Sequence, residues 1–150
     1  MTQVDFYHLT QSNLEAALLL LLKKTIAVGK TALILCPKPA AITLDTALWT
    51  LEVDSWIPHG VDDAKGVNVA PVWISTDPTR NPIFASFLFL LHGQTPPSLE
   101  GFERVFNIFD GRSEAQTSDA RAQWKKWGEN PSLQLSYYAE NIDGRWQKNT

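Results

Sequence analysis

The stretch IAVGKTALILC, residues 26–36, decides the fold, because it joins the end of an apolar helix directly to a buried strand. Gly29 stands where a left-handed residue follows a helix, and Lys30 lies near the last helical carbonyls. The apolar run from Thr31 to Cys36 ends at Pro37, which is typical of a strand inside a parallel sheet. A helix followed at once by such a strand predicts layered α/β structure.

The same stretch contains Gly29-Lys30-Thr31, the triplet that ends a phosphate-binding P-loop. A P-loop needs a second glycine five residues before Gly29, but that position is Lys24. It also runs from strand to loop to helix, whereas here a helix precedes the triplet and a strand follows it. The motif therefore fails on spacing and on context. A small nucleotide-dependent enzyme with a degenerate phosphate site at this triplet is the alternative function.

Outward from this stretch, apolar runs and helical spacing alternate along the chain. The polar segment 56–68 reads as a loop, and Ser12 and Gly128 read as the cap and the stop of two helices. This order predicts an α/β fold with a mostly parallel sheet, as one domain over residues 1–150. The predicted strands are 4–9, 31–36, 70–75, 83–91, 102–109 and 133–138, and the predicted helices are 13–28, 40–50 and 113–127.

Composition narrows the class of protein. The chain has 150 residues, a net charge of −3 and a single cysteine, which excludes an internal disulfide framework. The polar start and the short apolar run 18–22 predict a cytoplasmic protein with no membrane role. Residues 1–100 carry 6 basic and 9 acidic side chains, so we expect only weak direct binding to nucleic acid.

Side chains that do catalysis are sparse. His8, His59 and His92 have no metal-ligand or nucleophile spacing to one another or to Cys36, which reads as a buried thiol. The paired carboxylates at 62–63 have no visible acid–base partner. The sequence therefore predicts a protein that is not an enzyme and that uses no cofactor or metal.

Tryptophan, in contrast, is abundant, with 6 in the chain. Amphipathic aromatic residues and arginine mark the centres of protein–protein contacts. The basic residues of the last third gather on and around the predicted helix 113–127, where a solvated face is the plain alternative. This pattern directs attention to recognition.

Five segments resemble, in this order, the chi subunit of bacterial DNA polymerase III: DFYHL, VGKTALILC, LDTALWTLEVDSWIPHG, ERVFNIFDG and SDARAQWKKW. The most specific piece is Leu-Asp-Thr-Ala-Leu-Trp, residues 44–49, followed by Trp-Ile-Pro-His at 56–59. The resemblance covers nearly the whole chain. One departure is Trp124, where well-known members have tyrosine.

The resemblance implies a three-layer Rossmann-like fold and a non-catalytic accessory subunit of the DNA polymerase III holoenzyme, within its clamp-loader complex. Such a subunit binds the C-terminal tail of single-stranded DNA-binding protein and so links the replication machinery to coated lagging-strand template. A psi subunit or a helicase is the possible second partner.

The resemblance also points to two sets of site residues. The acidic tail ends in a phenylalanine, whose free carboxylate Arg121 would hold and whose ring Trp124 would cover. Lys125, Lys126 and Arg145 would steer the upstream aspartates. The alternative is that Trp124 and Trp127 only form the buried stripe of their helix. The psi or helicase interface would comprise Trp49, Trp56, Ile57 and Pro58, with core packing the alternative for both indoles.

Overall fold

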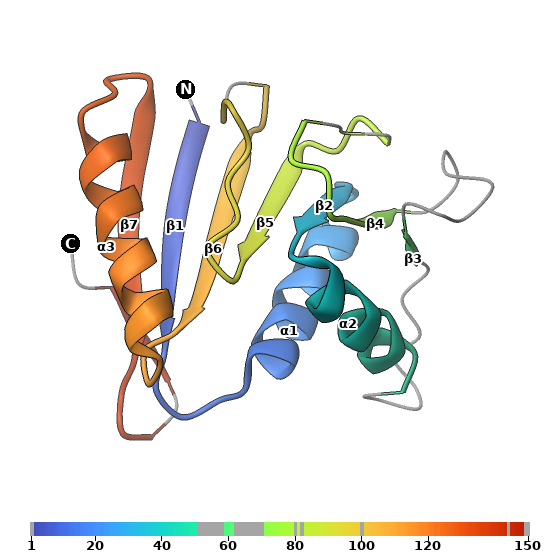
Figure 1. The fold of residues 1–150 in the computed structure, drawn as a ribbon, viewed down its shortest axis with the longest axis horizontal. Coiled ribbons are helices and arrows are strands. Elements are labelled where there is room, and N and C mark those ends of the chain that lie inside the picture. The colour runs from blue at the N-terminus through green and yellow to red at the C-terminus, as the bar shows by residue number, and fades with distance from the viewer. Residues whose placement is uncertain are drawn as a thin grey trace.

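The computed structural model describes residues 2–50, 59–61, 71–79, 81, 83–99, 101–143 and 145–148, with only the backbone of 48–50 and 59–61. In these residues the strands form one sheet in the order β3-β4-β2-β5-β6-β1-β7-β8 (Figure 1). Each neighbouring pair is parallel except β7 and β8. The strands are β1 (Thr2–Leu9), β2 (Ala32–Leu35), β3 (His59–Val61), β4 (Val72–Ser75), β5 (Phe87–Leu91), β6 (Arg104–Asp110), β7 (Leu133–Glu140) and β8 (Trp146–Lys148).

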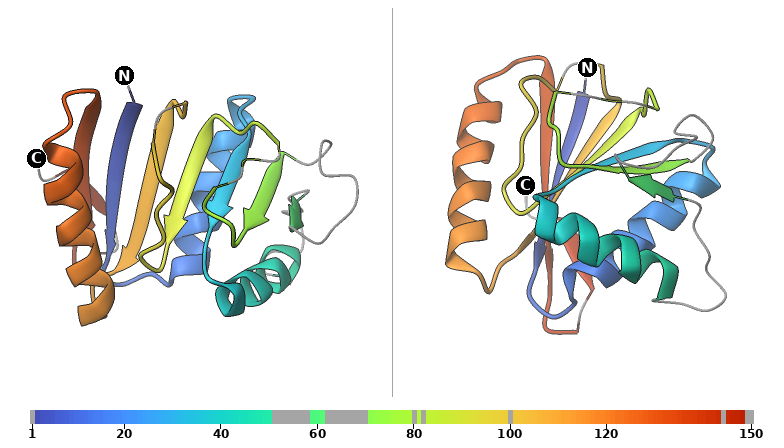
Figure 2. Two further views of the ribbon diagram at one scale, coloured as in Figure 1. Left: turned by 45° about the horizontal axis from the view of Figure 1, so that its top comes forward. Right: turned by 45° about the vertical axis from the view of Figure 1, so that its right-hand side comes forward.

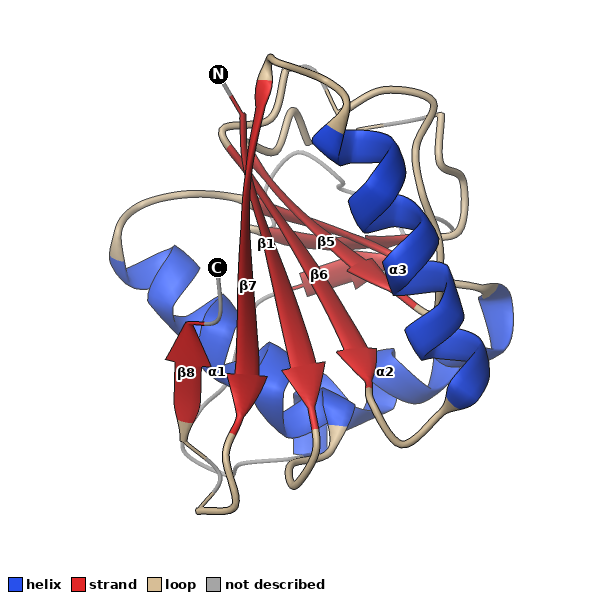
Figure 3. Cartoon of the chain, turned by 90° about the vertical axis from the view of Figure 1, so that its left-hand side faces the viewer, coloured by secondary structure: helices blue, strands red, loops and turns tan. Residues whose placement is uncertain are grey.

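Three helices cover the two faces of this sheet within the described residues: α1 (Leu14–Ala27), α2 (Lys38–Thr50) and α3 (Glu114–Gly128). One hydrophobic cluster joins α1 and α2 to the sheet, through side chains such as Leu18, Leu22 and Leu44. A second cluster joins α3 to the opposite face, through Ala120 and Trp127. Figures 2 and 3 show α3 alone on its side of the sheet. The predicted three-layer α/β architecture with a mostly parallel sheet is confirmed.

The stretch at residues 26–36 folds as the sequence indicates. Gly29 follows α1 with a φ of 75°, and its N–H donates to the carbonyl of Ile26 at 2.9 Å. Lys30 forms an ion pair with Glu103, with 3.0 Å between Nζ and Oε2. The triplet at 29–31 thus lies at a helix-to-strand turn, which is not the geometry of a phosphate loop.

The cap of α1 is one residue later than predicted. The side chain of Asn13, not Ser12, accepts the N–H of Ala16 at 2.7 Å. The hydroxyl of Ser12 donates instead to Oε2 of Glu140 at 2.6 Å. The Ser12 hydroxyl, which the local sequence predicts to cap the helix, is therefore hydrogen-bonded to a carboxylate 128 residues away.

Three strands differ from the prediction by more than a few terminal residues. The strand expected over 83–91 begins only at Phe87, because the Asn81 side chain hydrogen-bonds both backbone groups of Ala85 and Phe84 has a φ of 51°. The segment expected as a loop at 56–68 contains β3, which pairs with β4. β8 was not predicted at all, and it pairs antiparallel with the end of β7.

No helix among the described residues is long and apolar enough to cross a membrane. In the same residues, no three or more His, Cys, Asp or Glu side chains are grouped so that they could hold a metal ion.

Candidate functional site

A pocket of about 560 Å³ opens between α3 and the carboxyl ends of three adjacent strands. It lies where the chain leaves β1 toward α1 on one face and β6 toward α3 on the other. Ligands of open α/β sheets bind at such a switch point. We call it the α3 pocket, and it is lined by His8, Phe109, Thr117, Ala120, Arg121, Trp124 and Tyr137.

Helix α3 supplies four of the lining residues because they recur at positions i, i+3, i+4 and i+7 from Thr117. The Ser113 side chain caps the helix by accepting the N–H of Gln116. The amide of Gln123 fixes the helix to the sheet, because its Oε1 accepts from Asn107 Nδ2 at 2.6 Å. The helix therefore presents Arg121 and Trp124 from a fixed position.

The walls of the α3 pocket are aromatic. Trp124 meets Tyr137 edge-on, with 5.9 Å between ring centroids, and it also meets the buried Phe6 edge-on, with 5.2 Å between centroids. Phe109 packs against the His8 imidazole at 4.9 Å. Trp124 is half-buried and Trp127 is buried. Trp124 thus serves both the packing and the pocket, whereas Trp127 belongs to the core.

The cation of the pocket is Arg121, whose side chain is exposed. No described residue forms an ion pair with it. Arg104 and Arg112, by contrast, pair with Asp5 and Asp110. Arg121 lies beside an aromatic-walled pocket and pairs with no carboxylate in the part of the chain that the structure describes, so it offers a bidentate donor set to an incoming carboxylate.

His8 and Tyr137 form a hydrogen-bonded pair at the base of the pocket, between Nδ1 and the phenolic oxygen. Burial, and then the charge of Arg121, lower the pKa of His8 below its usual value, while Asp110 opposes them. Burial raises the pKa of Tyr137, and Arg121 partly offsets that rise. The pair is therefore a neutral imidazole and a neutral phenol at pH 7.

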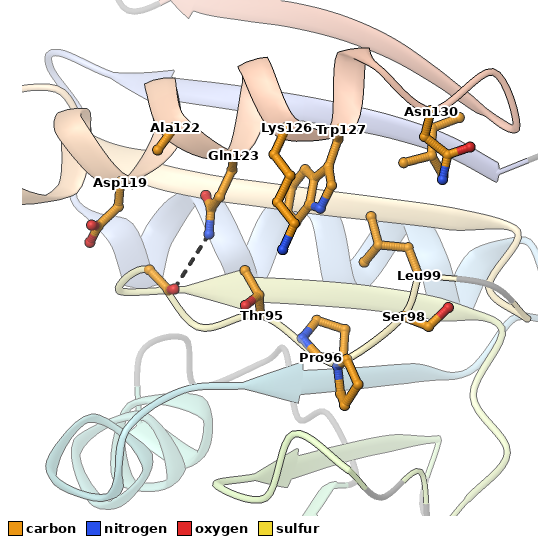
Figure 4. A pocket seen from close by; sticks show the side chains of 13 residues that line it. Thr95, Pro96, Ser98, Leu99, Asp119, Ala122, Gln123, Lys126, Trp127 and Asn130 are labelled. Atoms are coloured by element: carbon orange, nitrogen blue, oxygen red, sulfur yellow. Dashed lines mark hydrogen bonds between the residues drawn. The ribbon is translucent and has the colours of Figure 1, made fainter.

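The other basic residues of the predicted tail site are placed apart. Lys125 is exposed on α3 and does not line the α3 pocket. Lys126 projects to the other side of the helix, into a second pocket of about 430 Å³ between α3 and the Pro-rich loop 93–99 (Figure 4). Arg145 is exposed in the turn between β7 and β8. The structure thus brings together Arg121 and Trp124 but not the three peripheral cations.

The residues predicted for a psi or helicase interface are not placed by the structure. Trp56, Ile57 and Pro58 lie outside the described residues, and Trp49 is described only as backbone at the end of α2.

Sequence reasoning missed His8, Phe109 and Tyr137 as site residues. The helix spacing that identified Arg121 and Trp124 is local, whereas these three meet only through strand pairing. The available signal was that each lies near the carboxyl end of a predicted strand, where ligands of parallel sheets bind.

Comparison with known proteins gives one family. Its sequence model, described as DNA polymerase III chi subunit, HolC, matches residues 1–131, which include every residue of the α3 pocket except Tyr137. Among curated proteins, none matches the chain. The family is one of accessory subunits of the replicative polymerase. Because its model covers most of the sequence and the fold is that expected of it, the chain belongs to the DNA polymerase III chi subunit family.

Proposed function

We propose that this protein is a non-catalytic subunit of the clamp-loader complex and that its α3 pocket binds the C-terminal tail of single-stranded DNA-binding protein. The observation that carries the proposal is the joint placement of Arg121 and Trp124 in one pocket. That tail, acidic and ending in phenylalanine, offers a carboxylate and a ring together. The pocket offers a guanidinium and aromatic walls for them.

The energetics favour binding at the ring and the carboxylate over binding along the acidic chain. An aromatic contact contributes about 0.5–1.5 kcal/mol beyond area burial. A bidentate arginine–carboxylate pair adds strength and fixes the orientation of the peptide end. Lys125, Lys126 and Arg145 are exposed, so their attraction to aspartates raises the association rate and the salt dependence more than the affinity.

The test is a titration of a fluorescent peptide with the tail's sequence against wild type and Arg121→Ala. Losing this anchor should cost at least about 2 kcal/mol, roughly thirtyfold in Kd, with the fold intact. Arg145→Ala removes the same charge from a site outside the pocket and should change Kd little. Equal affinity losses in the two variants would show that net charge, and not the pocket, binds the peptide.

Two further elements of the proposal rest on the family alone. The first is the link between the clamp loader and coated template, which needs a second binding surface besides the α3 pocket. The second is the position of that surface, which we place at the segment from Trp49 to Pro58 as the site for psi or a helicase. Trp56→Ala should abolish that partner's binding without unfolding the protein. An unfolded variant would mean that the indole belongs to the core.

A further inference from the structure

The α3 pocket contains a second polar pair whose role the family match does not assign. His8 lies on β1 and Tyr137 on the adjacent β7, and both side chains face α3. In the tautomer that carries its proton on Nε2, neutral His8 accepts a hydrogen bond at Nδ1 from the Tyr137 hydroxyl. While the pocket is empty, the Tyr137 hydroxyl in that tautomer donates its proton to His8 and not to a ligand.

The imidazole has little room to move. The Phe109 ring packs against it at a centroid distance of 4.9 Å. Gly111 approaches the other edge of the ring so closely that a Cβ there would lie 1.8 Å from Nε2. A change in this pair is therefore a change in the position of protons and not a swing of the ring.

We propose that Tyr137 is a second ligand for the carboxylate that Arg121 binds, and that His8 takes up one proton from solvent when the carboxylate arrives. Protonated His8 donates its Nδ1–H to the Tyr137 oxygen. The phenolic O–H then turns to the carboxylate as a donor beside the guanidinium. One proton enters and no covalent bond to carbon changes. This inference rests on the proposed function, because it presupposes a peptide carboxylate in the pocket.

The charges around His8 set the direction of this coupling. Arg121 faces it from α3, Asp110 from β6 and Tyr137 from β7. Arg121 disfavours the imidazolium in the empty pocket, whereas a bound carboxylate offsets that repulsion. Asp110 is held by Arg112, with 2.8 Å between Oδ1 and Nε, so its charge stays constant. The pKa of His8 therefore rises on binding.

The sign of the effect follows from linkage. The complex holds more protons than the separate partners, so Kd falls as the pH falls through the pKa of bound His8. Affinity stops rising once the pH is below the pKa of His8 in the peptide-free protein, which is lowered from the usual 6.5. We expect Kd to fall by up to about tenfold over this range.

The experiment measures peptide affinity between about pH 5.5 and 8, above the range in which the peptide's aspartates titrate. The probe is an acidic peptide ending in phenylalanine with a free carboxylate, and the same peptide amidated at its end is the control. Wild type should bind the free-acid peptide more tightly at low pH and the amide weakly at every pH. Calorimetry in two buffers of different ionisation enthalpy should show proton uptake on binding.

Four variants separate the roles. His8→Gln should bind with a flat pH profile and no proton uptake, and His92→Gln, outside the pocket, should behave as wild type. Tyr137→Phe, which removes only the hydroxyl, should lose most of the gain at low pH. A pH-independent wild type without proton uptake, or a pH dependence that survives in His8→Gln, overturns the inference. Undiminished binding by Arg121→Ala would instead overturn the proposed function.

Discussion

Among single residues, the α3 pocket depends on a glycine outside it. Gly111 follows β6, and its N–H donates to the carbonyl of Leu9 at 2.8 Å. A side chain at this position would meet His8 Nε2 at 1.8 Å and the Leu9 carbonyl at 2.9 Å. The absence of a Cβ at residue 111 thus allows β1 and the β6–α3 turn to approach each other at the pocket.

Gly111→Ala is expected to displace the His8 ring and weaken binding of the tail peptide at least tenfold. Overpacking of this kind typically costs about 1–3 kcal/mol of the free energy of unfolding. Gly128→Ala is the matched control, because a Cβ there meets no atom within 4 Å. Urea denaturation and peptide titration measure both effects. Equal results for the two alanine variants would contradict the assigned role of Gly111.

The secondary elements that the sequence predicted are those whose signal is local. Apolar runs located β2 and β4, and helical spacing over residues 113–127 located α3. β3 and β8 are only three residues long, and pairing with a neighbour, more than their own pattern, makes them strands. The residues of the α3 pocket likewise fall into those with a local sequence signal and those without one. Helix spacing predicted Arg121 and Trp124, but the strand register that adds His8 and Tyr137 is not local information.

A buried amide helps to join helix α3 to the sheet, and this contact gives a test at the level of elements. Gln123 accepts from Asn107 on β6, and its Nε2 donates to the Gly93 carbonyl at 3.4 Å. Gln123→Leu keeps the approximate volume but leaves the Asn107 amide without its acceptor. We expect a loss of about 1–3 kcal/mol in the free energy of unfolding.

The control for that substitution is Gln134→Leu on β7, where the side chain is exposed. A surface change of this type usually stays within about 0.5 kcal/mol of wild type. Chemical denaturation of the two variants side by side gives the comparison. If Gln123→Leu is as stable as Gln134→Leu, then the amide does not hold the helix.

Across the whole molecule, one carboxylate connects the last long strand to the first loop. Oε1 of Glu140 accepts the backbone N–H groups of Thr10, Gln11 and Ser12 at 3.0, 3.1 and 3.0 Å. Burial alone would raise the pKa of Glu140, but these hydrogen bonds and that of the Ser12 hydroxyl hold it below its ordinary 4.5. The ionised form is therefore favoured by folding.

The stability that Glu140 contributes should depend on pH in a defined direction. Its folded pKa is lowered, so the contribution is present above pH 4.5 and is lost as the pH falls through the folded value. Glu140→Gln should cost about 1–3 kcal/mol near pH 7, because hydrogen bonds to a charged group are replaced by weaker ones. Urea unfolding of both proteins from pH 7 to 3 should show the two stabilities converging. A constant difference over that range would contradict the assignment.

The position of β1 in the sheet also bears on the time course of folding. β1 lies between β6 and β7, so residue 3 pairs with residues 104 and 134. A ribosome makes β1 long before either neighbour, and closing loops of this length is slow compared with forming helices. During synthesis both edges of β1 stay unpaired until β6 and β7 are made. Val4 and Phe6 are also not yet covered by α3, which buries them in the folded protein. The nascent chain is therefore most prone to aggregate before residues 101–140 leave the ribosome.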